Sequence, residues 1–128
     1  MQRSKHFDRY MEGWVKGDAE MILSSCAEDF VFDDAIDGRF TKAEFPAYYE
    51  SLSDGVLEIT DVVAEESGGL ETAWCWYSLK PQPGSALASQ EGAAVAKVGP
   101  DGVRSQKVTH YAREPQTVPR VSGPGSSA

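Results

Sequence analysis

One stretch decides how the rest of the chain is interpreted: Glu28-Asp29-Phe30-Val31-Phe32-Asp33-Asp34-Ala35-Ile36-Asp37-Gly38. Its apolar centre, Phe30 to Phe32, predicts a short strand that runs into carboxylates and an Asp-Gly turn. Strand ends hold functional side chains firmly, and neighbouring strand residues face opposite sides. Two interpretations of Asp34 are open at this point, a general base in a pocket or an aspartate that caps the loop in a solvated turn, and Asp33 should face the opposite side.

The segment before this strand has helical periodicity. Phe7, Tyr10, Met11, Trp14 and Val15 recur at the spacing of one helix face. Gly17 and Asp18 then separate this helix from a second one over 19–27. After the strand, Thr41 and Glu44 form a capping-box pattern that predicts a third helix, with its apolar face at Phe45, Tyr48, Tyr49 and Leu52.

The second half of the chain has strand periodicity. Strands are expected over 56–65, 70–80, 86–98 and 103–113, separated by turns rich in glycine and proline. Helices followed by an antiparallel sheet define an α+β fold, with the helices on the concave face of a strongly curved sheet. Residues 1–114 should form one domain, and residues 115–128 a tail rich in Pro, Gly and Ser.

Charge and composition exclude several classes of function. The 128 residues carry a formal net charge of −8, which argues against nucleic acid or an anionic membrane as partner. No apolar run is long enough to span a membrane. Cys26 and Cys75 lie in apolar segments and are expected to be free buried thiols. With only two histidines and no CxxC pair, we expect no metal site, and a cytoplasmic location fits.

At this level the chain resembles the nuclear transport factor two-like superfamily, and within it the polyketide-cyclase-like and ketosteroid-isomerase-like proteins. The resemblance covers about residues 4–113. Its motifs are Arg9-Tyr10, Trp14, Gly17-Asp18, the segment Ala27 to Asp34, and the hairpin Val98 to Gly102. It implies a cone-shaped fold in which helices close a pocket. It is weakly specific for any one reaction, because one fold hosts many.

The resemblance also implies roles for individual residues. Tyr10 matches a tyrosine that donates a hydrogen bond to the substrate oxyanion, and Asp34 matches the base that carries the proton. An apolar setting would raise the pKa of Asp34 and make it a better base. Residues expected to contact substrate are Trp14, Tyr49, Trp74, Trp76 and Ala94.

The chain departs from the isomerase pattern on its last two strands. Ala94 occupies the place of the second oxyanion donor, which makes steroid isomerase itself a poor match. Lys107 falls on a position where cyclase-like members carry an acid or base. His110 has the opposite strand parity, so only one of Lys107 and His110 should face the pocket unless a bulge intervenes.

These patterns favour a cofactor-independent enzyme of the isomerase, cyclase or dehydratase type, acting on a small hydrophobic or polycyclic carbonyl compound. Asp34, Tyr10, His110 and Lys107 are its candidate catalytic residues. A non-catalytic ligand-binding or dimerisation module of the same fold is the alternative, and epoxide hydrolysis ranks lower for want of an Asp–Arg–Asp set. A homodimer is expected through outward-facing Val95, Val108 and Tyr77 or Leu79.

Overall fold

The computed structural model describes residues 5–113, and the tail expected over 115–128 lies outside them. Three helices and six strands make up the described chain. They are α1 (Lys5–Lys16), α2 (Ala19–Ser24), β1 (Cys26–Asp34), β2 (Gly38–Thr41), α3 (Phe45–Glu50), β3 (Gly55–Ser67), β4 (Leu70–Pro81), β5 (Gln90–Gly99) and β6 (Gly102–Arg113).

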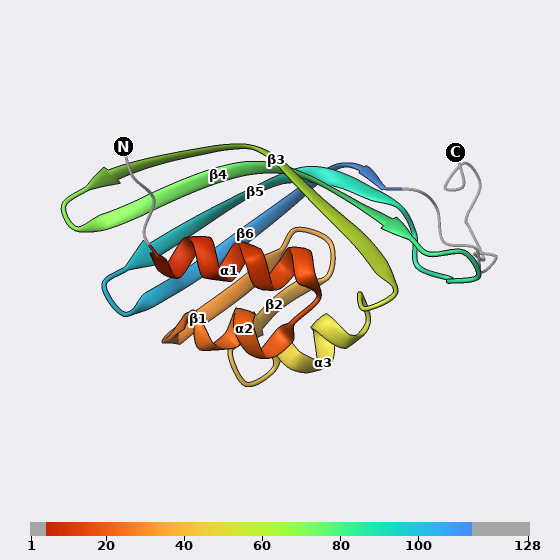
Figure 1. The fold of residues 1–128 in the computed structure, drawn as a ribbon, viewed down its shortest axis with the longest axis horizontal. Coiled ribbons are helices and arrows are strands. Elements are labelled where there is room, and N and C mark those ends of the chain that lie inside the picture. The colour runs from red at the N-terminus through yellow and green to blue at the C-terminus, as the bar shows by residue number, and fades with distance from the viewer. Residues whose placement is uncertain (1–4, 114–128) are drawn as a thin grey trace.

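The six strands form one curved, open sheet in the order β2-β1-β6-β5-β4-β3. All neighbouring pairs are antiparallel except β1 and β6, which run parallel. Helix α1 lies across the face of the sheet, with α2 and α3 beside β1 and β2 (Figure 1). The α+β class and the helix-covered, curved sheet expected from the sequence are thereby confirmed.

Local signals explain most of the element boundaries. The Asp18 carboxylate accepts a hydrogen bond from the Met21 N–H at 3.1 Å and caps α2. Thr41 and Glu44 make the reciprocal bonds of a capping box, at 2.9 and 3.3 Å, one turn before α3 begins. Three expectations differ from the structure. Helix α2 ends at Ser24 and β1 begins at Cys26, β2 was not expected, and the strand expected over 86–98 begins only at Gln90.

Irregular pairing bends the long strands. The register of β3 against β4 shifts between Thr60 and Val63, where Asp61 has a φ of 52°. A bulge of this kind strengthens the local twist, so the sheet curves around the helices. A second shift pairs Gly92, the residue after Glu91, with His110 and leaves Tyr111 as the extra residue on β6.

Aromatic side chains fill the space between the helices and β1. Trp14 of α1 packs edge-on against Phe45 and Tyr49 of α3, at ring-centre distances of 5.7 and 5.3 Å. Phe30 of β1 meets Phe45 edge-on at 5.8 Å. This cluster fixes α1 and α3 relative to the carboxyl end of β1, where Asp34 lies.

Small residues on β5 leave room elsewhere under the helices. Gly92, Ala94 and Ala96 alternate along the buried face of the strand. A Cβ at Gly92 would lie 1.9 Å from the Thr109 carbonyl oxygen and 2.9 Å from the Tyr77 ring. Glycine is therefore required where β6 and Tyr77 approach β5. Within residues 5–113, no helix is long and apolar enough to cross a membrane.

Candidate active site

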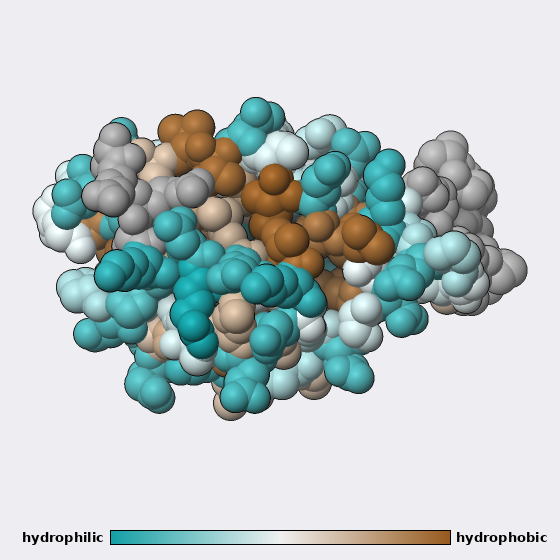
Figure 2. Space-filling view, viewed as in Figure 1, coloured by the Kyte–Doolittle hydropathy of each residue, from teal (hydrophilic) through white to brown (hydrophobic). Residues whose placement is uncertain are grey.

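A pocket lies between the helices and the concave face of the sheet. Its empty volume is about 620 Å³, open space at its mouth included. Most of its wall is apolar, with side chains such as Phe7, Phe32, Leu57, Ile59 and Val108. Hydrophobic residues gather along β3 on the face shown in Figure 2. The polar side chains of the wall are few: Tyr10, Asp34, Tyr48, Tyr77, Gln90, Gln106 and His110. An apolar cavity with a few convergent polar groups is typical of a small-molecule site.

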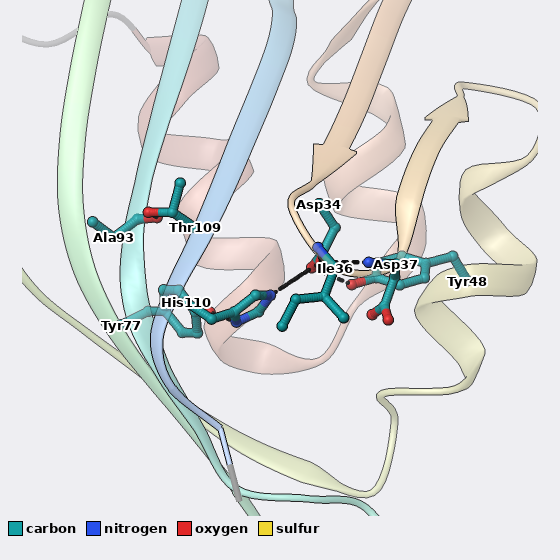
Figure 3. Close-up of polar contacts among 8 residues, drawn as sticks. All are labelled: Asp34, Ile36, Asp37, Tyr48, Tyr77, Ala93, Thr109 and His110. Atoms are coloured by element: carbon teal, nitrogen blue, oxygen red, sulfur yellow. Dashed lines mark hydrogen bonds and ion pairs between the residues drawn. The ribbon is translucent and has the colours of Figure 1, made fainter. Parts of the chain in front are cut away.

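Asp34, the last residue of β1, is 2% exposed and fully engaged in hydrogen bonds. Its Oδ1 accepts the backbone N–H groups of Ile36 and Asp37 at 2.8 and 2.9 Å. Its Oδ2 accepts the Tyr48 hydroxyl at 3.1 Å. Both oxygens lie 3.0 Å from His110 Nε2. Figure 3 shows these groups converging on the carboxylate from the loop, α3 and β6.

His110 joins the carboxylate to a tyrosine. Its side chain is 3% exposed, and its Nδ1 hydrogen-bonds the Tyr77 hydroxyl. Because a carboxylate only accepts hydrogen bonds, His110 Nε2 carries a proton and donates the hydrogen bond to Asp34. In the neutral ring, Nδ1 then accepts the Tyr77 O–H. A continuous chain of hydrogen bonds therefore runs from Asp34 through His110 to Tyr77 in the pocket wall.

The pKa of Asp34 lies below its ordinary value, contrary to expectation. Burial raises this pKa, but the Asp37 and Ile36 N–H groups and His110 stabilise the anion and outweigh burial. Asp34 is therefore a carboxylate near neutral pH, with both oxygens occupied. Its environment suits a group that orients and stabilises a histidine better than one that takes a proton itself.

Tyr10 and Trp14 place two donors at the helix side of the pocket. Tyr10 is 1% exposed, and burial raises the pKa of its phenol well above the ordinary value. The phenol is consequently a permanent donor. Within residues 5–113, neither the Tyr10 hydroxyl nor the buried Trp14 Nε1 completes a hydrogen bond of normal geometry. Unpartnered buried donors are costly, which points to acceptors supplied by a ligand.

The structure brings together Asp34, Tyr10, His110, Trp14 and Ala94, all of which line the pocket. It places Lys107 outside. Lys107 is exposed on the opposite face of β6, because Gln106, Val108 and His110 are the residues of that strand that point inward. Of the two alternatives on this strand, His110 is the one that faces the pocket.

Trp74 and Trp76 are not pocket residues. They are 42% and 47% exposed and lie on the outer face of the sheet, where Trp76 packs edge-on against Tyr111. The inward residues of β4 are those between and after them, Cys75 and Tyr77. The alternation of side chains along β4 decides which residues face the pocket, and the prediction that the two tryptophans face inward is wrong.

Helix α3 contributes Tyr48 to the pocket, not the expected Tyr49. Tyr49 packs against Trp14 and Phe45 in the core and is absent from the pocket wall. Tyr48 lines the pocket and reaches Asp34. Tyr48, Tyr77 and Gln90 were missed as site residues. Placing Cys75 inward would have found Tyr77, since alternate strand residues share a face.

The expected dimer face also needs correction. Val108, Tyr77 and Leu79 line the pocket and therefore do not point outward. The outer face of the sheet instead carries Trp74, Trp76 and Tyr111, the last of which is 65% exposed.

The two cysteines are free and buried, as expected. Burial raises the pKa of Cys26 to about 12 and that of Cys75 to about 11, so both are inert thiols near neutral pH. Among residues 5–113, no three His, Cys, Asp or Glu side chains cluster as a metal site requires.

N-terminal helices packed on a curved, open and mostly antiparallel sheet define an α+β fold of the nuclear transport factor two-like type. Within this class, the chain belongs to the SnoaL-like domain family, whose pattern matches residues 7–103. No protein of curated function matches the chain.

Solved structures agree on the fold. A candidate polyketide cyclase from Xanthomonas campestris pv. campestris has a TM-score of 0.65 and 18% identity, covering 81% of this chain and 86% of that one. A second candidate polyketide cyclase, from Silicibacter sp. TM1040, has a TM-score of 0.62 and 17% identity, covering 82% and 85%. An NTF2-like protein of unknown function from Pseudomonas putida KT2440 has a TM-score of 0.61 and 18% identity, covering 82% and 81%. Identities this low establish the fold and leave the reaction open.

Proposed function

We propose that the protein is a small-molecule enzyme of the isomerase, cyclase or dehydratase type that moves a proton in a hydrophobic carbonyl compound. The observation that carries this proposal is the buried chain Asp34–His110–Tyr77 in the wall of an apolar pocket. Buried polar networks in an otherwise apolar cavity are costly unless every member is satisfied. A network of acid, imidazole and phenol is a common means of moving protons.

The proton transfer follows from the hydrogen-bond order. An acidic C–H of the substrate gives its proton to the Tyr77 oxygen, while the Tyr77 proton passes to His110 Nδ1. The electron pair of the C–H bond stays on the substrate as an enolate. The imidazolium that forms is paired with the Asp34 carboxylate, whose lowered pKa keeps it charged. We call this path from the substrate through Tyr77 to His110 the relay. Its reversal returns a proton to the same or another carbon of the substrate.

Tyr10 supplies the complementary function. Its phenol stays protonated and lines the same pocket, so it can donate to the oxygen on which negative charge develops. The Trp14 side chain interacts with the Tyr10 hydroxyl and opposes part of the rise in its pKa, which leaves the phenol proton to be donated to the ligand. The chemistry assigned to these residues needs no cofactor.

A non-catalytic module remains the competing function. It would fit a pocket plugged by tryptophan and an aspartate in solvent. Here Asp34 is 2% exposed, Trp74 and Trp76 lie outside, and Asp34 and Tyr10 line one cavity. Those features favour the enzyme. Epoxide hydrolysis ranks below it, because no arginine contributes to the pocket wall within residues 5–113.

Exchange of an acidic C–H tests the proposal without knowledge of the substrate. The probe is 2-tetralone in D₂O, with NMR following loss of the proton signal between its ring and its carbonyl. We expect the wild-type protein to accelerate exchange and His110→Gln to lose at least a hundredfold. Lys107→Gln, on the same strand but the outer face, is the matched control and should keep the wild-type rate. Equal rates for His110→Gln and Lys107→Gln contradict the proposal.

The relay through Tyr77 has its own test. Tyr77→Phe removes the hydroxyl that contacts His110 and should slow exchange about a hundredfold. A Tyr77→Phe variant with the full rate shows that His110 takes the proton directly.

The outer face of the sheet supports a homodimer. Trp74, Trp76 and Tyr111 form an exposed aromatic surface of the kind that association covers. Sedimentation of Trp76→Glu should give a smaller species than the wild type. A wild-type monomer at micromolar concentration contradicts the dimer. A cytoplasmic location is part of the same proposal and is supported by the two free thiols.

A further inference from the structure

Gln90, the first residue of β5, has a buried amide nitrogen that finds no partner among the described residues. The residue is 4% exposed, lines the pocket, and its Nε2 has no hydrogen-bond partner within residues 5–113. The other two buried side-chain atoms of the described chain in this condition are the Tyr10 hydroxyl and Trp14 Nε1. All three can donate and all three residues line one pocket, but the Trp14 side chain also interacts with the Tyr10 hydroxyl, whereas Gln90 Nε2 stands apart from both. A buried donor left unpaired costs about 1–3 kcal/mol, which a ligand acceptor would relieve.

Strand pairing places Gln90 on the side of the pocket where the relay lies. It pairs with Leu79 on β4, two residues beyond Tyr77 on the same strand face. On β5 it is two residues before Gly92, which pairs with His110. Gly92 has no side chain to separate Gln90 from the relay. Tyr10 and Trp14 come from α1, so the pocket has donors on its sheet side and on its helix side.

The charges in the pocket wall restrict which ligand acceptors the donors of the pocket can bind. Within residues 5–113, the wall contains the Asp34 carboxylate and no lysine or arginine. An anionic ligand would meet a buried negative charge, and His110, the ionisable base in the wall within residues 5–113, is already bonded to that carboxylate. The acceptors of the ligand are therefore neutral oxygens, such as those of ketones, ethers or esters.

We propose that Gln90 is a specificity-determining residue whose Nε2 donates to a second, neutral oxygen of the substrate, distinct from the carbonyl oxygen held by Tyr10. The substrate is then a neutral ring compound with at least two acceptor oxygens on different sides. This inference rests on the proposed small-molecule pocket, but its test measures binding and does not depend on turnover.

The test compares ring ketones with one and two oxygens. The probes are 2-tetralone and its 5-, 6- and 7-methoxy derivatives, bound to the wild type and to Gln90→Met, whose side chain has similar length and no amide. We expect at least one methoxy isomer to bind the wild type five- to tenfold more tightly than 2-tetralone. Gln90→Met should lose that gain and bind 2-tetralone as the wild type does.

Three results overturn the inference. One is the absence of any gain among the methoxy isomers with the wild type. Another is an equal loss of affinity for every probe in Gln90→Met. The third is a lower melting temperature in both Gln90→Met and Gln90→Leu, which would make the amide a structural group. Removal of an unpartnered amide should leave the melting temperature unchanged or raise it. If 2-tetralone exchange fails while the methoxy gain depends on Gln90, the catalytic proposal falls and the binding inference stands.

Discussion

Replacement of Asp34 by asparagine separates the orienting role of this residue from the fold around it. In the wild type, one oxygen accepts the backbone N–H groups of Ile36 and Asp37, and the other accepts the Tyr48 hydroxyl. The asparagine carbonyl can keep the two backbone bonds. Its amide then replaces one of the two oxygens that lie 3.0 Å from His110 Nε2, so the tautomer that donates from Nε2 loses stability relative to the opposite one. In the opposite tautomer, His110 Nδ1 carries a proton and can no longer accept one.

The structure sets the size of both effects. The bonds from Tyr48 and His110 lose their charged acceptor, which costs about 1 kcal/mol each. A total of about 2 kcal/mol lowers the melting temperature of a domain of this size by roughly 10 °C. In the variant, His110 favours the tautomer that cannot accept a proton at Nδ1, and no carboxylate charge stabilises its imidazolium. Exchange of 2-tetralone should therefore slow about 10³-fold.

Asp33→Asn is the matched control for Asp34→Asn. Asp33 is the adjacent residue of β1, on the other face of the strand, and pairs with Arg39 and Lys107. Thermal melting and 2-tetralone exchange are measured on both variants. Asp33→Asn should change neither by much. If Asp34→Asn retains the rate of Asp33→Asn while folded, the tautomer argument is wrong.

Three further perturbations test the same geometry. Tyr48→Phe removes one donor to Asp34 and should cost about 1 kcal/mol by thermal melting, whereas a loss above 3 kcal/mol would show a role beyond this bond. Because the pKa of Asp34 is lowered from 3.8, its contribution to stability is complete above about pH 5 and is lost as the pH falls through its folded pKa. The stability difference between wild type and Asp34→Asn, from urea titrations, should therefore shrink from pH 5 to pH 3, and a constant difference contradicts the assignment. Gly92→Ala should cost 3 kcal/mol or more, since its Cβ would lie 1.9 Å from the Thr109 oxygen. Ala93→Gly, at the next residue, should cost only about 1 kcal/mol, and equal losses would refute the steric argument.

The sequence predicts the fold because its local signals agree with one another. The stripe from Phe7 to Val15 and the cap at Asp18 have the structural counterparts that they predict. The capping box at Thr41 forms in the turn before α3, which begins at Phe45 without a side-chain cap. The edge strand β2 escapes prediction because four mostly exposed residues after a turn carry no periodic pattern. The early start of β1 is equally hidden, since Cys26 and Ala27 suit a helix as well as a strand.

The site is predicted less completely, because strand parity is decided over long distances. Asp34 and Tyr10 are singled out by the family resemblance, because a strand end and a helix face alone favour a loop-capping aspartate and a core tyrosine. Tyr77 is not predicted, because nothing local tells which of Trp76 and Tyr77 faces inward. His110, the partner of Asp34, lies 76 positions further along the chain, and the pairing of β1 with β6 brings the two residues together. The lowered pKa of Asp34 depends on backbone N–H groups of the loop, which no residue pattern reveals.

The most direct measurement of the central claim is ¹⁵N NMR of the histidine rings, with and without 2-tetralone. The chain has two histidines, so His6 on α1 serves as the internal reference and His110→Gln gives the assignment. We predict that His110 holds its proton on Nε2, with Nδ1 unprotonated, and that saturating 2-tetralone shifts Nδ1 of His110 while His6 stays unchanged. A His110 ring protonated on Nδ1 alone, or one that 2-tetralone leaves unchanged at saturation, contradicts the assignment of His110 as the proton acceptor of this pocket.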